Sequence, residues 1–249
     1  MSKCSAALFA ICVWVAPLCA EGAVLPRLEQ GEKLTICAIG TSVTGSYWDP
    51  ANKVSVPSAW FPLLGKWLNS LYPEQVTIHN EGIGGAASKF TPTYANGNGG
   101  SGLDVQLDRA LAHNPDVLFI EFAVNDAYHK YGISKQASKD NLQEMIDRTR
   151  AWAAKHNKSV EIVVQTMNNI THEGDRPEEA AYYQGYRDVA KANGLLLIDH
   201  YRNWLKLYDS EEDHATWKSN VPDGAHPNEK GAQIVILPEI QKVLKNQKR

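Results

Sequence analysis

LTICAIGTSVTGS, residues 34–46, is the stretch that decides the fold of this chain. Its first half, 34–39, is an apolar run that predicts a buried strand, and its second half is small and rich in hydroxyl groups. In open α/β sheets, ligands bind outside the carboxyl ends of the strands, where this turn would lie. Such a turn suits a nucleophilic serine, a phosphate-binding loop or a plain turn.

Four further apolar runs predict strands, and segments of helical periodicity separate them. The predicted strands are 76–80, 116–122, 160–165 and 195–199; the predicted helices are 58–68, 103–111, 135–156, 178–193 and 228–245, the last kinked at Pro238. Residues 44–57, broken by Pro50 and Pro57, are predicted to form a long loop. Strands that alternate with helices imply a parallel sheet with helices on both faces. We therefore predict one doubly wound, three-layer α/β/α domain with a five-stranded parallel sheet.

The composition describes an ordinary globular protein. Hydrophobic residues make up 43% of the 249 residues and charged residues 21%, with a formal net charge of -3. This balance gives no electrostatic footprint for nucleic acid or for an anionic membrane surface. No nucleic-acid partner is therefore expected, and the sequence says nothing about the oligomeric state. The partner predicted from the motifs described below is a small-molecule or carbohydrate ester.

The first twenty residues have the pattern of a secretory signal peptide. Lys3 supplies a positive charge, residues 6–15 are almost wholly apolar, and Ala20 is a small residue at a plausible cleavage point. The apolar run is shorter than the roughly 20 residues that span a bilayer, so no stable membrane insertion is expected. We predict a signal peptide over 1–20, a mature domain over 21–249, and a secreted or periplasmic protein. Of the four cysteines, only Cys37 would remain after cleavage.

Polar residues follow the ends of the predicted strands and should meet at one edge of the sheet. Ser42 follows the first strand, a glycine cluster at 82–85 follows the second, and Asn125 follows the third. Near the C-terminus, Asp223 and His226 lie three residues apart in a turn made by proline and glycine. A serine hydroxyl needs a base within hydrogen-bond reach, which a neutral imidazole supplies, and a carboxylate orients the imidazole. Backbone and side-chain N–H groups at the same edge would stabilise an oxyanion.

Four blocks of this sequence resemble those of the SGNH/GDSL esterases and lipases. They are Gly40-Thr41-Ser42, Asn80-Glu81-Gly82-Ile83-Gly84-Gly85, Ala123-Val124-Asn125-Asp126 and Asp223-Gly224-Ala225-His226. The resemblance implies a flavodoxin-like sheet, no cofactor, and an esterase with Ser42 as nucleophile and Asp223 and His226 as acid and base. It also implies an oxyanion hole formed by Ser42, Gly85 and Asn125, with Gly82 as the alternative to Gly85. The chain departs from the family pattern at Thr41, which replaces an aspartate, and at Ala123, which replaces a glycine.

Several aromatic side chains fall on loops at the expected active edge. Tyr47 and Trp48 suit stacking against sugar rings, although aromatic rings also serve as ordinary cover residues. His172 follows the fourth strand and is predicted to contact the substrate as well. We therefore predict hydrolysis of acyl esters, with acetyl esters of carbohydrates as the substrate class. No spacing of histidine, cysteine and acidic residues indicates a metal site.

Two other functions remain open at this stage. The first is a flavin- or phosphate-binding module, because the hydroxyl-rich turn resembles the phosphate loop of flavodoxins. Ser46, however, stands where a nucleotide-binding P-loop has its lysine, and the long loop separates the turn from the next helix. The second is an inactive carbohydrate-binding protein on the same fold. The presence of all three residues of a Ser-His-Asp set argues against this function.

Overall fold

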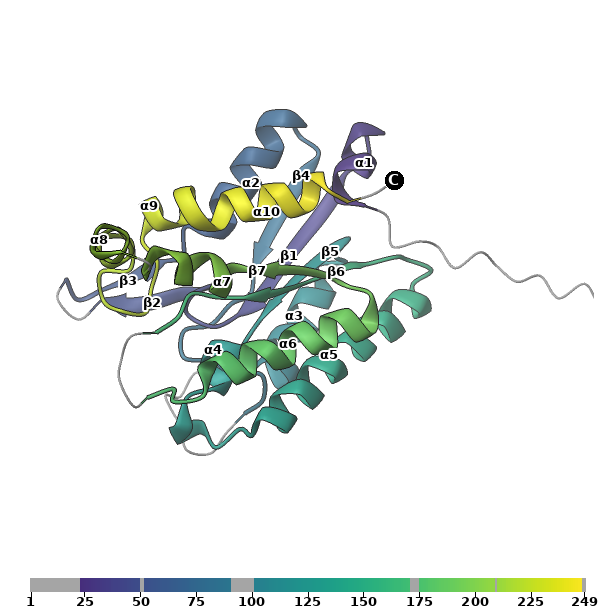
Figure 1. Cartoon of the computed structure of the whole chain (residues 1–249). Coiled ribbons are helices and arrows are strands. Elements are labelled where there is room, and N and C mark those ends of the chain that lie inside the picture. Colours follow the sequence, from purple (N-terminus) through teal and green to yellow (C-terminus); the bar gives the residue numbers. More distant parts are fainter. Residues whose placement is uncertain (1–22, 50–51, 91–100, 171–174, 209, 248–249) are drawn as a thin grey trace, which may run out of the picture.

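A five-stranded parallel sheet with helices on both faces forms the body of the protein (Figure 1). The structure is a computed structural model, and it describes residues 23–49, 52–90, 101–170, 175–208 and 210–247. The predicted signal peptide lies outside these residues. Within the described parts of the chain, no helix is long and apolar enough to cross a membrane.

The elements follow one another in the order that the sequence pattern predicts, with additions. The sheet contains β1 (Leu34–Gly40), β4 (Val76–Asn80), β5 (Val117–Glu121), β6 (Glu161–Thr166) and β7 (Leu196–Asp199); a hairpin contains β2 (Ser46–Asp49) and β3 (Val54–Pro57). The α-helices are α1 (Val24–Glu29), α2 (Trp60–Leu71), α3 (Leu107–Ala112), α4 (Ala123–Asp126), α5 (Lys135–Lys155), α6 (Glu179–Asn193), α7 (His200–Leu205), α8 (Glu211–Asn220), α9 (Glu229–Gly231) and α10 (Leu237–Lys245). Short 3-10 helices follow α4 and α7, and π-helical turns precede α3 and α10.

The strand order is β4-β1-β5-β6-β7, and every pairing in this sheet is parallel. Numbered along the sheet strands alone, this is the order 2-1-3-4-5 of flavodoxin-like folds, which confirms the predicted fold class. The connection reverses direction beside β1, between β1 and β5. The carboxyl end of β1, which leads into Ser42, therefore lies at the topological switch point where such folds bind ligands.

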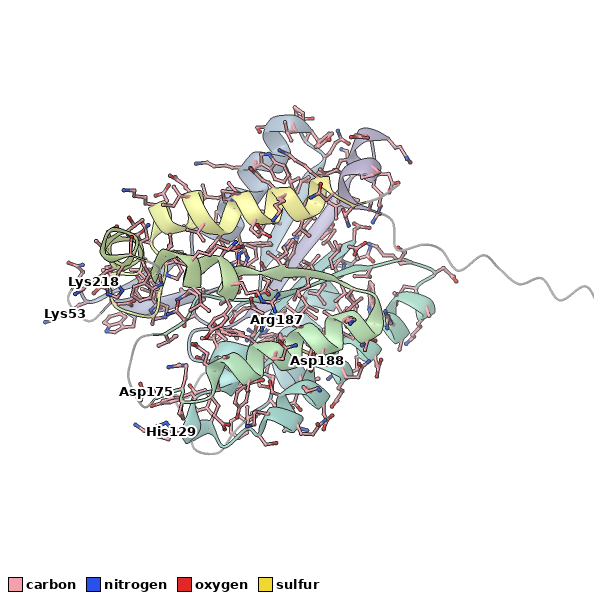
Figure 2. All side chains as sticks on the ribbon, viewed as in Figure 1. Lys53, His129, Asp175, Arg187, Asp188 and Lys218 are labelled. Atoms are coloured by element: carbon pink, nitrogen blue, oxygen red, sulfur yellow. The ribbon has the colours of Figure 1, made fainter. Side chains whose placement is uncertain are left out.

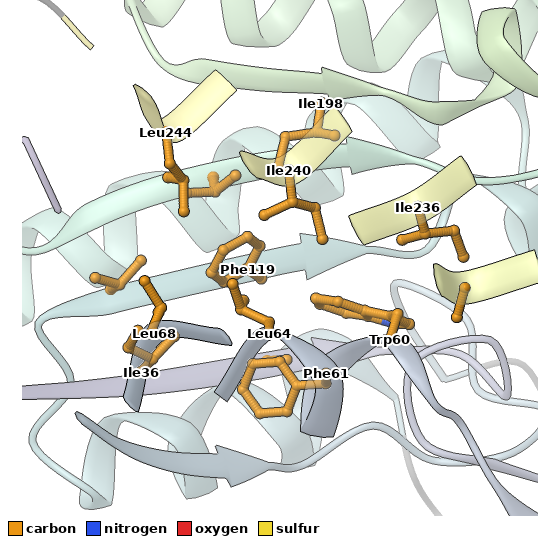
Figure 3. Close-up of a cluster of buried hydrophobic side chains, with 14 of the residues drawn as sticks. Ile36, Trp60, Phe61, Leu64, Leu68, Phe119, Ile198, Ile236, Ile240 and Leu244 are labelled. Atoms are coloured by element: carbon orange, nitrogen blue, oxygen red, sulfur yellow. The ribbon is translucent and has the colours of Figure 1, made fainter. Parts of the chain in front are cut away.

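Two apolar clusters cover the two faces of the sheet, because successive strand residues point to opposite sides. Ile36 and Phe119 pack with α2 and α10 on one face, and Figure 3 shows this cluster around Trp60 and Phe61. Ile39 and Leu118 pack on the other face with α3, α5 and α6. The central strand β5 is buried along its whole length.

The predicted long loop over 44–57 is wrong, because its ends pair as the antiparallel hairpin β2–β3. The strand segments carry Tyr47, Trp48, Val54 and Val56, which are residue types that favour strands. Pro57 is tolerated because it lies at the end of a two-stranded ribbon. Among the described residues no further strand pairs there, so the missing N–H of the proline removes no hydrogen bond to another strand.

The predicted C-terminal helix is interrupted. Asn228 caps α9 by accepting a hydrogen bond from Gly231 N–H at 2.9 Å, and a π-helical turn over Ala232–Ile236 then leads into α10. Pro238 lies in the first turn of α10, where a missing N–H is tolerated. The bend predicted at this proline thus takes the form of a π-helical turn just before it.

Candidate active site

Ser42 lies in a tight turn directly after β1. The N–H groups of Thr44 and Gly45 donate to the carbonyl of Thr41 at 3.1 and 2.9 Å and close the turn around Ser42. The carbonyl of Val43 accepts from Ser58 Oγ at 2.6 Å and from Trp60 Nε1 at 3.1 Å. The turn is therefore held both by its own backbone and by the start of α2.

The carboxylate of Glu121 lies beneath this turn. Its Oε2 accepts from Thr41 N–H at 3.0 Å and from Thr44 Oγ1 at 3.0 Å, and Thr41 Oγ1 donates at 3.1 Å. Glu121 is 1% exposed, and burial, which outweighs these hydrogen bonds, raises the pKa of Glu121 to about 8. The threonine that replaces the family's aspartate thus donates to an acid supplied by the neighbouring strand.

The glycine segment after β4 packs closely against the same turn. A Cβ atom at Gly45 would lie 2.1 Å from the carbonyl oxygen of Gly82, a distance that no side chain can occupy. Asn80 Nδ2 also donates to the carbonyl of Thr44 at 2.7 Å. Two of the four sequence blocks therefore meet backbone to backbone.

Asp223 and His226 lie in a turn between α8 and α9. Asp223 Oδ1 accepts from the N–H groups of Ala225 and His226 at 2.9 and 2.7 Å, so the carboxylate itself shapes the turn. Gly224 has a φ of 79°, which a residue with a side chain rarely adopts. Asn168 Nδ2, beyond β6, donates to the carbonyl of Ala225 at 2.8 Å and ties the turn to the sheet.

A chain of hydrogen bonds joins Ser42, His226 and Asp223. His226 Nδ1 is 2.7 Å from Asp223 Oδ2, and His226 Nε2 is 2.9 Å from Ser42 Oγ. A carboxylate can only accept, so a neutral imidazole carries its proton on Nδ1 and accepts the serine proton at Nε2. Burial opposes ionisation of Asp223, but the hydrogen bonds from the ring and backbone of His226 and from Ala225 N–H prevail and lower its pKa to about 2. The carboxylate is thus ionised at any ordinary pH.

Tyr47 stacks on the face of His226. The ring centroids are 4.1 Å apart and the planes differ by 6°. The two nitrogens of His226 are held by Asp223 and Ser42, and Tyr47 covers one face of the ring, so three contacts orient the imidazole. Tyr47 also lines the cleft, but its main contact in the structure is with His226.

Ser42, Gly85 and Asn125 line the cleft and each carries an N–H group without an acceptor among the described residues. Within the described parts of the chain, no acceptor receives the backbone N–H of Ser42 or of Gly85, and both residues line the cleft. Gly82 differs, because its N–H already donates to Asn80 Oδ1 at 3.0 Å. Asn125 also lines the cleft, and one proton of its Nδ2 goes to the carbonyl of Ala86 at 2.8 Å, which leaves the other proton free.

These groups open into a cleft of about 730 Å³. The β2–β3 hairpin forms one wall with Trp48, which is 61% exposed, and Tyr128 and Tyr131 stand in another. Ile83, Val124 and Ile170 give the cleft apolar side chains, and Asp175 and Arg176 contribute opposite charges. Such a mixed, open site suits a ligand that has both apolar and polar parts.

The structure brings together most of the predicted site residues. Ser42, Tyr47, Trp48, Gly85, Asn125 and His226 all line the cleft, and Asp223 lies behind His226. His172 falls outside the described residues. The prediction missed Glu121 and Arg176. Glu121 had a signal, since it is an acid at the end of an apolar strand; Arg176, between β6 and α6, had none.

The described residues offer no site for a metal ion, since no group of three histidine, cysteine or acidic side chains is arranged to hold one. Cys37 is buried, and burial raises the pKa of its thiol to about 12, so it is not a thiolate ligand or nucleophile.

A sequence profile of the GDSL-like Lipase/Acylhydrolase family matches residues 38–234. The chain belongs to this family. Membership makes it a carboxylic ester hydrolase, as the four sequence blocks imply. No curated protein sequence matches it significantly.

Solved structures of this hydrolase fold resemble the chain at low sequence identity. A lipase/acylhydrolase from Enterococcus faecalis is 21% identical with a TM-score of 0.63, and the match covers 87% of this chain and 100% of that one. An acetylxylan esterase from Geobacillus stearothermophilus is 16% identical with a TM-score of 0.63 and coverage of 86% and 94%. A carbohydrate acetylesterase family member from Sinorhizobium meliloti is 17% identical with a TM-score of 0.63 and coverage of 85% and 99%. At these identities, the similarity establishes the shared fold.

The buried carboxyl of Glu121 predicts a pH-dependent stability. Its pKa is about 8 in the folded protein against an ordinary value of 4.5, so the folded protein keeps a proton that the unfolded chain releases. Stability therefore falls as the pH rises between these values. We expect Glu121→Gln to flatten this fall by up to about 1 kcal/mol per pH unit, measured as the free energy of unfolding in urea.

Some pH dependence should remain in the Glu121→Gln variant, because burial also raises the pKa of Asp126 to about 6 and that of Glu179 to about 8. Glu144→Gln, at an exposed position on α5, is the matched control and should leave the slope unchanged. An identical slope in the wild type and Glu121→Gln would contradict the prediction.

Proposed function

We propose that this protein is a serine esterase that uses a Ser-His-Asp triad and an acyl-enzyme. Ser42 is the nucleophile, His226 the general base and then the general acid, and Asp223 the residue that orients the imidazole. The hydrogen bond of 2.9 Å between Ser42 Oγ and His226 Nε2 carries this proposal. It joins a weak nucleophile to the base that activates it.

The reaction proceeds in two halves. Ser42 Oγ attacks the ester carbonyl carbon while its proton moves to His226 Nε2, and the carbonyl oxygen becomes an oxyanion. Collapse of the tetrahedral intermediate breaks the bond to the alcohol, which takes the proton from His226 and leaves. Water then repeats the attack on the acyl-enzyme, releases the carboxylic acid and restores the Ser42 hydroxyl.

We assign the oxyanion hole to the backbone N–H groups of Ser42 and Gly85 and to Asn125 Nδ2. This assignment is supported by the free N–H groups of these residues, whereas Gly82 N–H is engaged by Asn80. Losing one such donor typically lowers kcat by about 10²- to 10³-fold.

The substrate that suits the site best is an acetyl ester of a carbohydrate. The open cleft accommodates a large alcohol side, and the exposed Trp48 offers a flat apolar face of the kind that sugar rings pack against. Two structural relatives are described as acting on such compounds, an acetylxylan esterase and a carbohydrate acetylesterase family member.

The triad predicts that Ser42→Ala abolishes ester hydrolysis. Initial rates with p-nitrophenyl acetate should fall by at least about 10³-fold, because the nucleophile is lost while binding is retained. The circular dichroism spectrum and unfolding midpoint should match the wild type, since Ser42 Oγ contacts only His226 Nε2 among the described residues. Turnover close to that of the wild type would disprove the triad.

The carbohydrate proposal predicts a selective effect of Trp48→Ala. KM for acetylated xylan should rise about three- to tenfold, because a stacking surface is lost, whereas KM for p-nitrophenyl acetate should stay the same. Val54→Ala is the matched control, since Val54 is 48% exposed on the same hairpin but does not line the cleft. Equal effects of Trp48→Ala on both substrates, or no acetate release from acetylated xylan, would refute a carbohydrate site at Trp48.

We also propose that residues 1–20 act as a signal peptide and direct the protein to a secreted or periplasmic location. The proposal is supported by Lys3, the apolar run over 6–15 and the small residue Ala20. Intact-mass analysis of the exported protein should give a mature chain that begins near Glu21. A full-length chain that stays inside the cell would count against it.

A further inference from the structure

Arg176 is a charged residue that lines the cleft and contacts Asn125, and the proposed triad does not use it. Its Nη2 donates to Asn125 Oδ1 at 3.1 Å, and its Nε donates to the carbonyl of Val124 at 2.7 Å. One guanidinium group thus donates hydrogen bonds both to the Asn125 side chain and to the backbone carbonyl of the preceding residue, Val124.

The Asn125 amide is held on both of its ends. Arg176 donates to Oδ1, and one proton of Nδ2 goes to the carbonyl of Ala86 at 2.8 Å. A flipped amide would direct its oxygen at the carbonyl of Ala86 and its NH2 group at a cation, so only one orientation is compatible with both neighbours. In that orientation, the second Nδ2 proton is the one group of the amide left for a ligand.

Arg176 is itself held firmly. Its guanidinium lies 4.9 Å from the centre of the Tyr128 ring, in cation–π contact, and its carbonyl accepts from Glu179 N–H at 3.2 Å. The preceding residue, Asp175, accepts through its carbonyl from His129 N–H at 3.1 Å, and Figure 2 shows the two residues near each other. The cation therefore occupies a defined place rather than a mobile one.

We propose that Arg176 is a positioning residue for the oxyanion hole: it orients the Asn125 amide and polarises it toward the developing negative charge. The inference rests on the proposed function, since it assigns a supporting partner to the Asn125 donor. A cation on the carbonyl end of an amide draws electron density from the N–H end, and linked hydrogen bonds strengthen one another in this way. The effect grows as the oxyanion forms, so it belongs to the transition state rather than to substrate binding.

The test is a double-mutant cycle on p-nitrophenyl acetate, a substrate with no charge for Arg176 to bind. Arg176→Met should lower kcat by roughly 10- to 100-fold with KM changed less than about twofold. Asn125→Ala should lower kcat by about 10²- to 10³-fold. Adding Arg176→Met to Asn125→Ala should lower kcat by no more than about twofold further, because the group that Arg176 acts on is gone.

Arg176→Lys provides an intermediate variant. An ammonium keeps the charge but cannot donate in a fork to both Val124 and Asn125, so we expect only partial recovery of kcat relative to Arg176→Met. Arg187→Met is the matched control. Arg187 lies on α6, pairs with Asp199 at 2.7 Å and rests 5.8 Å from the Tyr201 ring, so its loss should affect stability but leave kcat of the folded enzyme unchanged.

The outcomes separate the inference from the proposed function. If Ser42→Ala and Asn125→Ala keep wild-type kcat, the proposed function fails. If those two lose activity as expected but the effect of Arg176→Met multiplies with that of Asn125→Ala, or appears in KM alone, the positioning role is overturned. Should Arg176→Met fail to fold, the same cycle with Arg176→Lys carries the test, with unfolding midpoints measured for each variant.

Discussion

The hydrogen bond between Ser42 and His226 joins residues that are 184 positions apart in the sequence, so it depends on the tertiary fold. Neither residue is placed by its immediate neighbours alone. Ser42 follows a central strand of the sheet, and His226 lies in a turn that α7, α8 and the apolar cluster around Trp204 and Trp217 hold above the same edge. The parallel sheet is what brings the ends together, because all five strands finish at one edge and β1 finishes at the switch point.

Three buried carboxyl groups accept hydrogen bonds from segments at the active edge, and their burial lowers the stability of the fold when they ionise. Glu121 supports the Ser42 turn, Asp126 accepts from Ser88 N–H and Ser138 Oγ at 2.8 and 2.6 Å, and Glu179 accepts from Ile170 N–H at 3.3 Å. Burial raises the pKa of all three, so the ionised form of each is less stable in its place than it would be in water. Once ionised, these acids disfavour folding, yet they accept hydrogen bonds from N–H groups of loops at the active edge. This combination indicates that loop geometry, rather than stability, governs these positions.

The parts of this structure that could be predicted are those governed by local pattern. The five sheet strands follow from apolar runs with helices between them, and the residues of the proposed triad come from motifs that each sit at a strand end or in a terminal turn. The hairpin was missed because prolines and polar residues in 44–57 outweighed the strand preference of Tyr47, Trp48 and Val56. Arg176 could not be foreseen, since its contact with Asn125 crosses 51 residues and depends on how the segment before α6 packs against α4.

The hairpin also explains how one element can serve both the proposed triad and the cleft. Successive residues of a strand face opposite sides, so Tyr47 can lie flat on His226 while Trp48 faces outward at the mouth of the cleft. Ser46 lies on the same strand face as Trp48, and Ser55 pairs with Trp48 across the ribbon; all three line the cleft. Tyr47 lines the cleft as well, so the ring that stacks on His226 is part of the same wall. A change at Ser46, Trp48 or Ser55 therefore alters the cleft wall but leaves in place the Tyr47 ring that stacks on His226.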